Sequence, residues 1–594
     1  MAETKPSLGQ GSENDHIRQD AIGGTSLDRR YYRSFRFLGS MVAFSLSLCG
    51  SYVGYLLPVG ILTIINADIG PDANYPMIAV AWTISNALGN LLVGRLSDIF
   101  GRRYFLLVGN ALGLLGFIVS AVARNISSLI GASVLIGLSA SVSLTFYSAA
   151  GELVPIKDRG YWYFAIFVPV IPFGMFSAWL AHNFVLIATW RWCYYLAIII
   201  QGCAVILLAV AYFPPSVEQL HSEKSRRQLI SEIDCLGIFL YTAGTVLFLL
   251  GVSWGGSTYP WKSSEVIACL VVGGVTLILF FTWEGFGHPT SPLLPVKFLV
   301  GDKRGFFFPA ILGGVDSMFY YGLTLIWPTQ VNTVYTTGLR TEGWLASILS
   351  AASQTGTMVA TLVFYRMGHQ RIALGVAFTI MVGLTGGLTV TNPTNRALAI
   401  GLVTPAGFCI GFSETIILML GQACRDPHMI GLAVGTLGFL RLLFGAVAQA
   451  LYTTILSNRL ATTLPRRITE FAVNAGLPTS ALPDLFQAVA TQDPDALNSV
   501  PNITSSVIEA VTMGQKFAYA DAFSSVYWTA FAFGAVGVVL TPFVRKDVND
   551  EMTAYVPKKL RGVLDDGKVA DGKDLEFEKG QSTTHVDHPL AKSA

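Results

Sequence analysis

Charged residues are scarce in this chain of 594 residues. Only 13% of its residues are charged, while 52% are hydrophobic. A soluble globular protein has about 25% charged residues, so this composition predicts an integral membrane protein with the lipid bilayer as a partner. The net charge of +2 is too small to indicate nucleic acid or another polyanion as a partner.

The sequence also lacks the motifs of nucleotide-driven pumps, metal sites and disulfide frameworks. It contains no Gly-x-x-x-x-Gly-Lys-Ser/Thr phosphate loop, so we expect no use of ATP. Its seven cysteines lie in or beside apolar runs without Cys-x-x-Cys spacing, which argues against a disulfide framework and a zinc site. We therefore expect no enzyme activity, no cofactor and no metal, and any pumping requires another energy source.

An early apolar core with a small-residue cleavage site is missing as well. The segment from Met1 to about Arg36 is polar and ends in a basic run. We therefore expect the first apolar segment to be an uncleaved membrane anchor rather than a signal peptide.

Long apolar segments are abundant, and fourteen of them reach the length of about 20 residues that a helix needs to cross the membrane. Their approximate limits are 40–66, 76–97, 104–123, 128–151, 161–186, 192–213, 234–254, 264–286, 305–328, 343–365, 371–391, 397–422, 430–457 and 522–544. The sequence therefore predicts an all-α polytopic membrane protein.

The arginines and lysines between these segments predict the orientation. One alternate set of loops is rich in them, whereas the opposite short loops hold only Arg124, Arg191, Lys262, Arg340 and Arg396. By the positive-inside rule, both termini are expected to be cytoplasmic. Two glycosylation sequons, at Asn125 and Asn502, fall in loops assigned to the outside. Asn502 is the stronger candidate, because Asn125 is expected too close to the membrane.

A ten-residue turn between the second and third segments is the most informative part of the sequence. It reads Gly94-Arg95-Leu96-Ser97-Asp98-Ile99-Phe100-Gly101-Arg102-Arg103 and must be a tight, water-facing hairpin. A weaker copy, Tyr365 to Arg371, follows the tenth segment and keeps a glycine at Gly368 but no acid.

This repeat divides the chain into two six-helix halves with an inserted pair of helices, the arrangement that parallel repeats give facilitator transporters. The expected parts are a polar tail 1–39, a first bundle 40–213, a cytoplasmic linker 214–233, the inserted pair 234–286, a second bundle 305–544 with an outer loop 458–515, and a disordered cytoplasmic tail 545–594.

The hairpin resembles the signature loop of major facilitator transporters. Further motifs narrow the resemblance: Glu152-Leu-Val-Pro155 with Arg159-Gly160, Trp190-Arg-Trp192, Asp234-Cys-Leu-Gly237 and Trp254-Gly-Gly256. Together they are similar to fourteen-span drug:proton antiporters, most of all the fungal trichothecene-efflux-pump-like subgroup, from about residue 35 to 545. Two features depart from the antiporters. Ser133 stands where many of them have an arginine, and their Gly-Pro-rich stretch is kept only as Pro169, Pro172 and Gly174.

The resemblance implies that the hairpin acts as a gate. Charge-assisted bonds can lock helix ends together there, and breaking the lock opens the gate. Positive-inside topology with a tight turn would explain the arginines and glycines without gating, but it does not explain Asp98. The candidate gating residues are Gly94, Asp98, Gly101, Arg102, Arg103, Glu152 and Arg159.

Three ionisable residues, Asp316, Glu414 and Arg441, lie inside predicted spans, where a charge is costly and marks a function. Their positions along the helices place them near one level. We expect Glu414 to be the proton-coupling carboxylate, with Arg441 as its changing partner and Asp316 as a further candidate. The alternative is a permanent ion pair that only holds two helices together.

A substrate pocket in such a protein should be apolar and aromatic with scattered hydrogen-bonding groups. For each candidate, contact with lipid or helix packing is the alternative role. The candidates are Tyr52, Tyr55, Asn86, Asn90, Phe146, Tyr147, Tyr320, Tyr321 and Gln354.

These features favour a secondary active transporter that exports a moderately hydrophobic small molecule by alternating access, driven by protons. The resemblance implies a fungal toxin, secondary metabolite or xenobiotic as the substrate. Two alternatives remain at this point: proton-coupled uptake of an iron-siderophore complex, and a transport-dead sensor or scaffold. A monomer in the plasma membrane is expected, with a vacuole or vesicle membrane as the alternative location.

Overall fold

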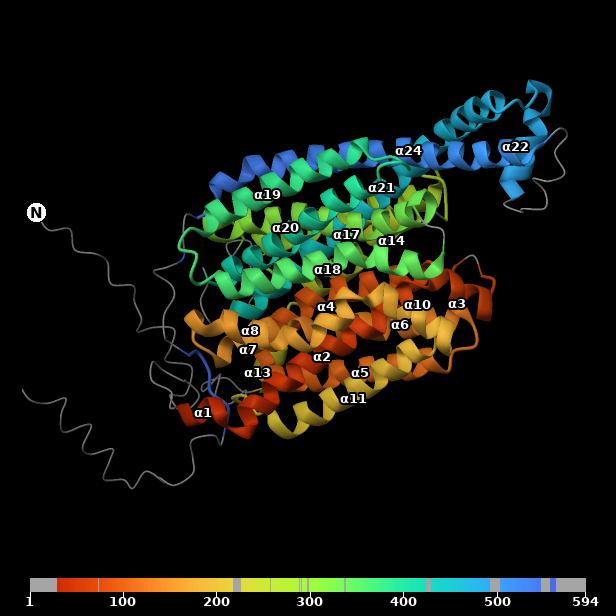
Figure 1. The fold of residues 1–594 in the computed structure, drawn as a ribbon. Helices are drawn as coiled ribbons and strands as arrows, with labels where there is room; N and C mark the ends of the chain where they lie inside the picture. Colours follow the sequence, from red (N-terminus) through yellow and green to blue (C-terminus); the bar gives the residue numbers. More distant parts are fainter. Residues whose placement is uncertain are drawn as a thin grey trace, which may run out of the picture.

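The computed structural model describes residues 29–72, 74–216, 226–256, 258–287, 289, 291–295, 299–335, 338–423, 429–491, 503–545, 548 and 556–561. Within these ranges the chain is helical, and its only β-structure is two isolated bridges. The long helices lie side by side in one elongated bundle (Figure 1).

The first half and the second half of the chain form separate groups of helices in this bundle (Figure 1). The first group contains α2 (Phe35–Val59), α4 (Met77–Phe100), α5 (Arg102–Ala121), α6 (Ile126–Leu144), α7 (Phe146–Leu153), α8 (Arg159–Phe167), α9 (Ile171–Met175), α10 (Ser177–Ile187) and α11 (Trp192–Ala211). The second contains α17 (Phe308–Gln330), α18 (Leu339–Val363), α19 (Gln370–Gly387), α20 (Arg396–Ala423), α21 (Ile430–Asn474) and α24 (Ser505–Leu540).

Helices occupy each of the segments that the sequence predicts as spans. Eleven of the described helices are long and apolar enough to cross a membrane, or up to twelve if one bent pair counts as a single span. Helices α17 and α18 are not among them, although they pack in the same bundle. The chain is therefore a multi-pass helical membrane protein.

The predicted fifth span is bent rather than straight. Its segments Ile156–Met175 and Ser177–Ile187 meet at 54°. Pro169 and Pro172 lie just before the bend, and proline has no N–H to donate to a helical hydrogen bond. The Gly-Pro-rich stretch of the sequence thus marks a broken helix.

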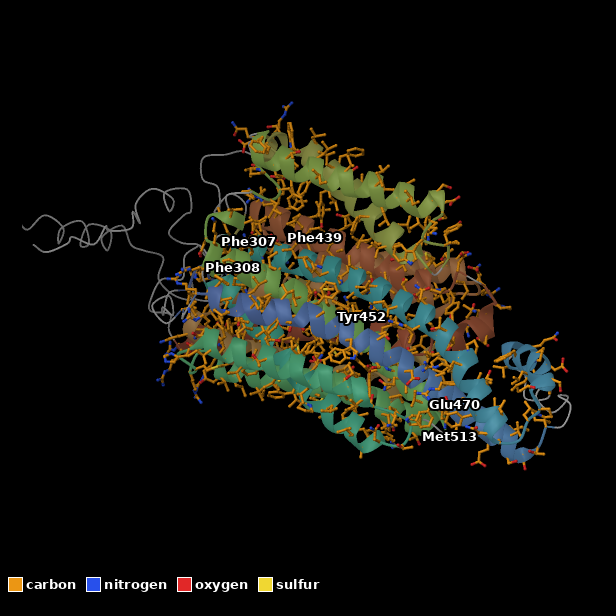
Figure 2. All side chains as sticks on the ribbon, turned by 90° about the horizontal axis from the view of Figure 1, so that it is seen from above. Phe307, Phe308, Phe439, Tyr452, Glu470 and Met513 are labelled. Atoms are coloured by element: carbon orange, nitrogen blue, oxygen red, sulfur yellow. The ribbon has the colours of Figure 1, made fainter. Side chains whose placement is uncertain are left out.

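The inserted helices α14 (Cys235–Trp254) and α15 (Ser264–Phe286) lie at one edge of the bundle (Figure 2). Tyr241 of α14 donates to the carbonyl oxygen of Ala87 on α4 at 2.8 Å. Its ring also packs on Phe439 of α21, with 5.2 Å between ring centroids. The inserted pair therefore contacts both halves.

One end of the bundle carries a projecting arm (Figure 1). The sequence predicts a loop over 458–515, but α21 continues to Asn474, α22 spans Leu482–Thr491, and α24 begins at Ser505. The arm has a small core of its own, formed by Ile468, Ala472, Leu477, Ala481, Leu485, Ala488, Val507 and Val511. Apolar residues at helical spacing thus extend both helices beyond the predicted membrane boundary. Glu470 and Met513, labelled in Figure 2, lie on this arm.

We call the opposite end of the bundle the hairpin end, because the α4–α5 hairpin turns there at Gly101. Three short helices lie outside the main bundle: α1 (Arg29–Arg33) and α13 (Arg226–Ser231) at the hairpin end, and α3 (Leu62–Ile69) at the arm end (Figure 1). The sequence predicts a disordered tail from residue 545. Within that tail, however, Val556, Pro557, Lys558 and Leu560 are buried.

Candidate functional site

A buried charge cluster lies at the hairpin end, centred on the guanidinium group of Arg102. Arg102 donates to Asp98 at 2.7 Å and to the two carboxylate oxygens of Glu152 at 2.9 and 2.6 Å. It also donates to the hydroxyl of Ser148. The fork geometry of arginine suits this bidentate recognition of Glu152. Asp98 and Arg102 are close because they stand four residues apart across the turn at Gly101.

Asp98 also connects the two halves of the protein. Its second carboxylate oxygen accepts a hydrogen bond at 2.9 Å from the backbone N–H of Leu432, in the first turn of α21. The N-terminal N–H groups of a helix have no partner within the helix and favour an anion. Asp98 therefore fixes the end of α4 to the start of α21.

The predicted gating residues Arg103 and Arg159 lie outside this cluster. Arg103 donates to the carbonyl oxygens of Tyr212 and Ala209, at 2.5 and 3.0 Å, and lies 3.7 Å from the centroid of the Phe213 ring. It ties α5 to the end of α11. Arg159 is 1% exposed, and among the described residues its Nε and Nη2 have no hydrogen-bond partner.

The structure requires glycine at two positions of the hairpin, Gly94 and Gly101, for different reasons. Gly101 has φ 84°, a conformation that favours glycine. Gly94 lies against α21: a Cβ atom at this position would be 2.6 Å from the carbonyl oxygen of Gly431 and 3.1 Å from the Cα atom of Gly435. Close contact between α4 and α21 therefore depends on Gly94.

Replacing Gly94 with alanine is expected to destabilise the protein, because the added methyl group meets backbone atoms that cannot rotate away. Overpacking of this kind costs about 1–3 kcal/mol. Thermal unfolding of the purified protein would measure the loss. Gly131→Ala is the matched control, since nothing lies within 4 Å of a Cβ atom there. Equal unfolding temperatures for the two variants would show that the contact between α4 and α21 is not tight.

The second copy of the hairpin, between α18 and α19, has no comparable cluster among its described residues. Gly368 keeps the positive φ of Gly101, at 62°. Gln370 donates to the carbonyl oxygen of Phe364 at 3.2 Å, and the guanidinium of Arg366 lies 5.6 Å from the ring centroid of Tyr161. The repeat therefore preserves the turn, but its described residues lack the acid and the buried charge cluster of the first copy.

A second charged site lies in the middle of the bundle. Glu414 of α20 forms an ion pair with Arg441 of α21, whose guanidinium also lies 5.1 and 5.5 Å from the ring centroids of Tyr320 and Tyr321. The hydroxyl of Ser413 donates to Asp316 of α17 at 2.5 Å. Since Ser413 precedes Glu414, the structure brings all three predicted ionisable residues together.

Narrow cavities between the two halves open onto this ion pair. Both cavities contain Tyr147, Leu144, Leu418, Glu414 and Arg441. One of them is also lined by Leu48, Tyr52, Phe167, Tyr320, Ser353, Gln354, Thr357 and Thr415, and the other by Asn90, Gly313, Ile417, Val434, Leu437 and Gly438. Apolar and aromatic walls with a few hydrogen-bonding groups are typical of a small-molecule site.

The predicted pocket residues divide into two sets. Tyr52, Asn90, Tyr147, Tyr320 and Gln354 line these cavities. The others are not among the residues that line the cavities. Tyr55 stacks on Trp82, Asn86 accepts hydrogen bonds from Asn90, Phe146 packs on Phe167, and the ring of Tyr321 lies against Gly445.

Sequence reasoning missed Ser353, Thr357 and Thr415 in the cavity wall. Thr357 lies three residues after Gln354 on α18, so helical spacing could have suggested it. Among the described residues, no group of three or more histidine, cysteine, aspartate or glutamate side chains could hold a metal ion.

Asn125, one of the two predicted glycosylation sites, has no part in either charged site. Asn125 is exposed, and its side chain caps α6 by accepting from the backbone N–H of Ser128 at 2.8 Å. Asn502 lies outside the described residues.

A family model for the fungal trichothecene efflux pump (TRI12) matches residues 7–592. The chain belongs to this family. The TRI12 match includes both charged sites and residues 556–561, and it confirms the resemblance that the sequence motifs indicate.

Individual relatives support the same assignment. The chain is 29% identical to the "Trichothecene efflux pump TRI12" of Fusarium sporotrichioides, over 92% of each chain. It is 28% identical to the pump of the same name from Trichoderma arundinaceum, over 93% of this chain and 94% of that one. It is also 25% identical to the "Efflux pump dotC" of Dothistroma septosporum, over 85% and 84% of the two chains.

The fold has a counterpart among solved structures. The major facilitator proton:xylose symporter XylE superposes with a TM-score of 0.54 and 13% identity, over 88% of this chain and 99% of that one. At this identity the likeness establishes the major facilitator fold alone.

Proposed function

We propose that this TRI12-family protein is a proton-coupled exporter of a moderately hydrophobic small molecule, such as a fungal toxin, secondary metabolite or xenobiotic. The observation that supports the proposal is the ion pair of Glu414 and Arg441 at the wall of an aromatic cavity between the two halves. The names of the similar pumps from Fusarium, Trichoderma and Dothistroma favour export over uptake of an iron-siderophore complex.

The proposed topology has fourteen spans with both termini in the cytoplasm. Adding α17 and α18 to the twelve candidate spans gives this number. The basic loops support an orientation with the hairpin end in the cytoplasm and the arm outside. We expect a monomer in the plasma membrane, with Asn502 and Asn125 on the outer side.

Coupling in this proposal depends on the proton affinity of Glu414. While Glu414 contacts Arg441, the positive guanidinium favours the ionised carboxylate. When α20 and α21 shift against each other within the second half and the pair separates, the carboxylate takes up a proton from the side to which the cavity is open. Re-forming the pair releases that proton on the other side. The side chains of Arg441 and Glu414 are 25% and 23% exposed, so water in the cavity can reach both.

The substrate would lie against the same pair. Tyr52 and Tyr147 come from the first half, and Tyr320 and Gln354 come from the second. A molecule bound between them contacts both halves, so it can follow their movement in alternating access. The hairpin cluster acts as the cytoplasmic gate, since Asp98 joins α4 to α21 at that end.

The test of this function is transport by the purified protein in liposomes with an imposed pH gradient, screened with candidate compounds in both directions. Proton-driven movement of a compound opposite to the proton flow is the expected result. Movement in the same direction as the protons would favour uptake. Binding without transport, together with signalling that depends on the terminal tail, would favour a sensor.

A further inference from the structure

A short C-terminal segment, Val556–Arg561, lies against the N-terminal half at the hairpin end. Within it, the residues Val556 and Leu560 are each 2% exposed, and Lys558 is 6% exposed. By sequence the segment follows α24, the last helix of the C-terminal half. We call it the strap. It contacts the opposite half from the one to which it is attached.

The strap is held by backbone hydrogen bonds to helix ends. The N–H of Lys558 donates to the carbonyl oxygen of Glu152, near the end of α7, at 2.9 Å. The N–H of Arg561 donates to the carbonyl oxygen of Phe213, just after α11, also at 2.9 Å. The last carbonyl groups of a helix have no partner within the helix, so the strap satisfies groups that would otherwise need water.

Side chains fix the strap at its far end. Arg561 donates from Nε to the carbonyl oxygen of Pro214 at 2.9 Å, and Arg36 donates to the carbonyl oxygen of Arg561. The N–H of Leu560 donates to the hydroxyl of Tyr31 at 3.3 Å. Burial raises the pKa of Tyr31, so this hydroxyl stays protonated and neutral.

The important contact is made by the ammonium group of Lys558, which lies 2.9 Å from Oε1 of Glu152. The same oxygen accepts from Arg102 at 2.6 Å. By direct ion pairs, the cluster at the hairpin end therefore consists of Asp98, Glu152, Arg102 and Lys558, and its two carboxylates have two directly bonded cations only when the strap is in place. Without Lys558, two buried carboxylates would share a single cation, and a buried charge without a partner favours the entry of water.

These contacts also extend across the interface between the halves. Lys558 holds Glu152, Glu152 and Asp98 hold Arg102, and Asp98 accepts the N–H of Leu432 from the C-terminal half. A change at Lys558 therefore reaches the closed gate through two carboxylates and one guanidinium.

We propose that the strap is a built-in latch, in which Lys558 supplies the second cation of the gate cluster and favours the conformation closed at the hairpin end. The structural part of this proposal stands on the contacts of Val556–Arg561. Its effect on transport rests on the proposed function. Release of the strap would leave the cluster negatively charged and make the hairpin end open more readily.

The first experiment is hydrogen–deuterium exchange of the full-length purified protein. The amides of Lys558, Leu560 and Arg561 are expected to exchange at least about tenfold more slowly than unprotected amides, because each donates a hydrogen bond. Exchange of these three amides at the unprotected rate in the wild type would overturn the latch.

The second experiment compares Lys558→Met with Lys559→Met, since Lys559 is the neighbouring lysine and is only half-buried. Lys558→Met should speed exchange at the start of α21, where Leu432 donates to Asp98, by about tenfold. It should also lower proton-driven accumulation in liposomes by a similar factor. Lys559→Met should leave both unchanged, and Lys558→Arg should restore both. Identical behaviour of the Lys558→Met and Lys559→Met variants would refute the role of Lys558.

The two readouts separate the latch from the proposed function. If the wild type moves no compound but the strap and α21 respond as expected, the latch stands and export fails. If transport occurs but Lys558→Met leaves the exchange rate at the start of α21 unchanged, the latch is refuted and the proposal of export stands.

Discussion

Replacing Glu414 with glutamine is expected to abolish accumulation driven by a pH gradient, because the amide cannot take up and release a proton. The loss should be at least about a hundredfold, since this variant removes the proposed coupling group itself. Exchange of labelled for unlabelled compound across the membrane needs no net proton movement, so a part of it should remain. Liposomes with an imposed gradient measure the first activity, and counterflow measures the second.

Two controls separate coupling from stability. Glu414→Gln leaves the half-buried Arg441 without its partner, so this variant is also expected to lose stability. The double variant Glu414→Gln with Arg441→Gln removes both charges and should recover stability without recovering accumulation. Glu470→Gln, on the arm, where the side chain is 50% exposed, should change neither. Proton-dependent accumulation by the Glu414→Gln variant would leave the pair with only a structural role.

Replacing Asp98 with asparagine is expected to cripple turnover. The asparagine keeps a side-chain oxygen for the N–H of Leu432, but it loses the ionic contact with Arg102 at 2.7 Å. The buried cluster then holds two cations and one carboxylate, so the closed gate is destabilised. We expect transport to fall by at least about tenfold, which corresponds to about 1.4 kcal/mol. Initial rates in liposomes at saturating substrate measure this effect.

The second copy of the hairpin provides matched controls for Asp98. Arg366 lies over the ring of Tyr161, and the ring of His369 contacts the carbonyl oxygen of Gly368 in its own loop. Neither residue has a contact equivalent to that of Asp98 with Leu432. Arg366→Gln and His369→Gln should therefore keep most of the activity. An equal loss of transport in the Asp98→Asn, Arg366→Gln and His369→Gln variants would mean that the hairpin only marks membrane topology.

Much of this fold could be predicted from local sequence. Apolar length sets where a membrane helix can form, and the expected segment 264–286 agrees with α15 at both ends. The extension of α21 to Asn474 could not be predicted in the same way. Beyond the membrane a helix needs an apolar stripe and a partner, and local sequence does not show that α22 and α24 pack against this part of α21.

Some residues of the candidate site could also be predicted from the sequence, and others could not. A charge inside an apolar span is visible in the sequence, so Asp316, Glu414 and Arg441 could be selected before the structure was known. Leu432 gave no signal, because it contributes a backbone N–H that every residue except proline has. Lys558 also gave none, because it lies in a polar, charged tail, and its partner Glu152 is 406 residues away.

The length of α24 has a mechanical consequence. This helix runs without a break for 36 residues, or about 54 Å, whereas the hydrocarbon layer is about 30 Å thick. In the proposed cycle, the part beyond the membrane moves as a lever with the half to which it belongs. A tilt of about 10° around the membrane centre would carry its outer end through about 7 Å. The position of the arm outside the membrane would then differ between the two conformations of the cavity, open to one side or to the other.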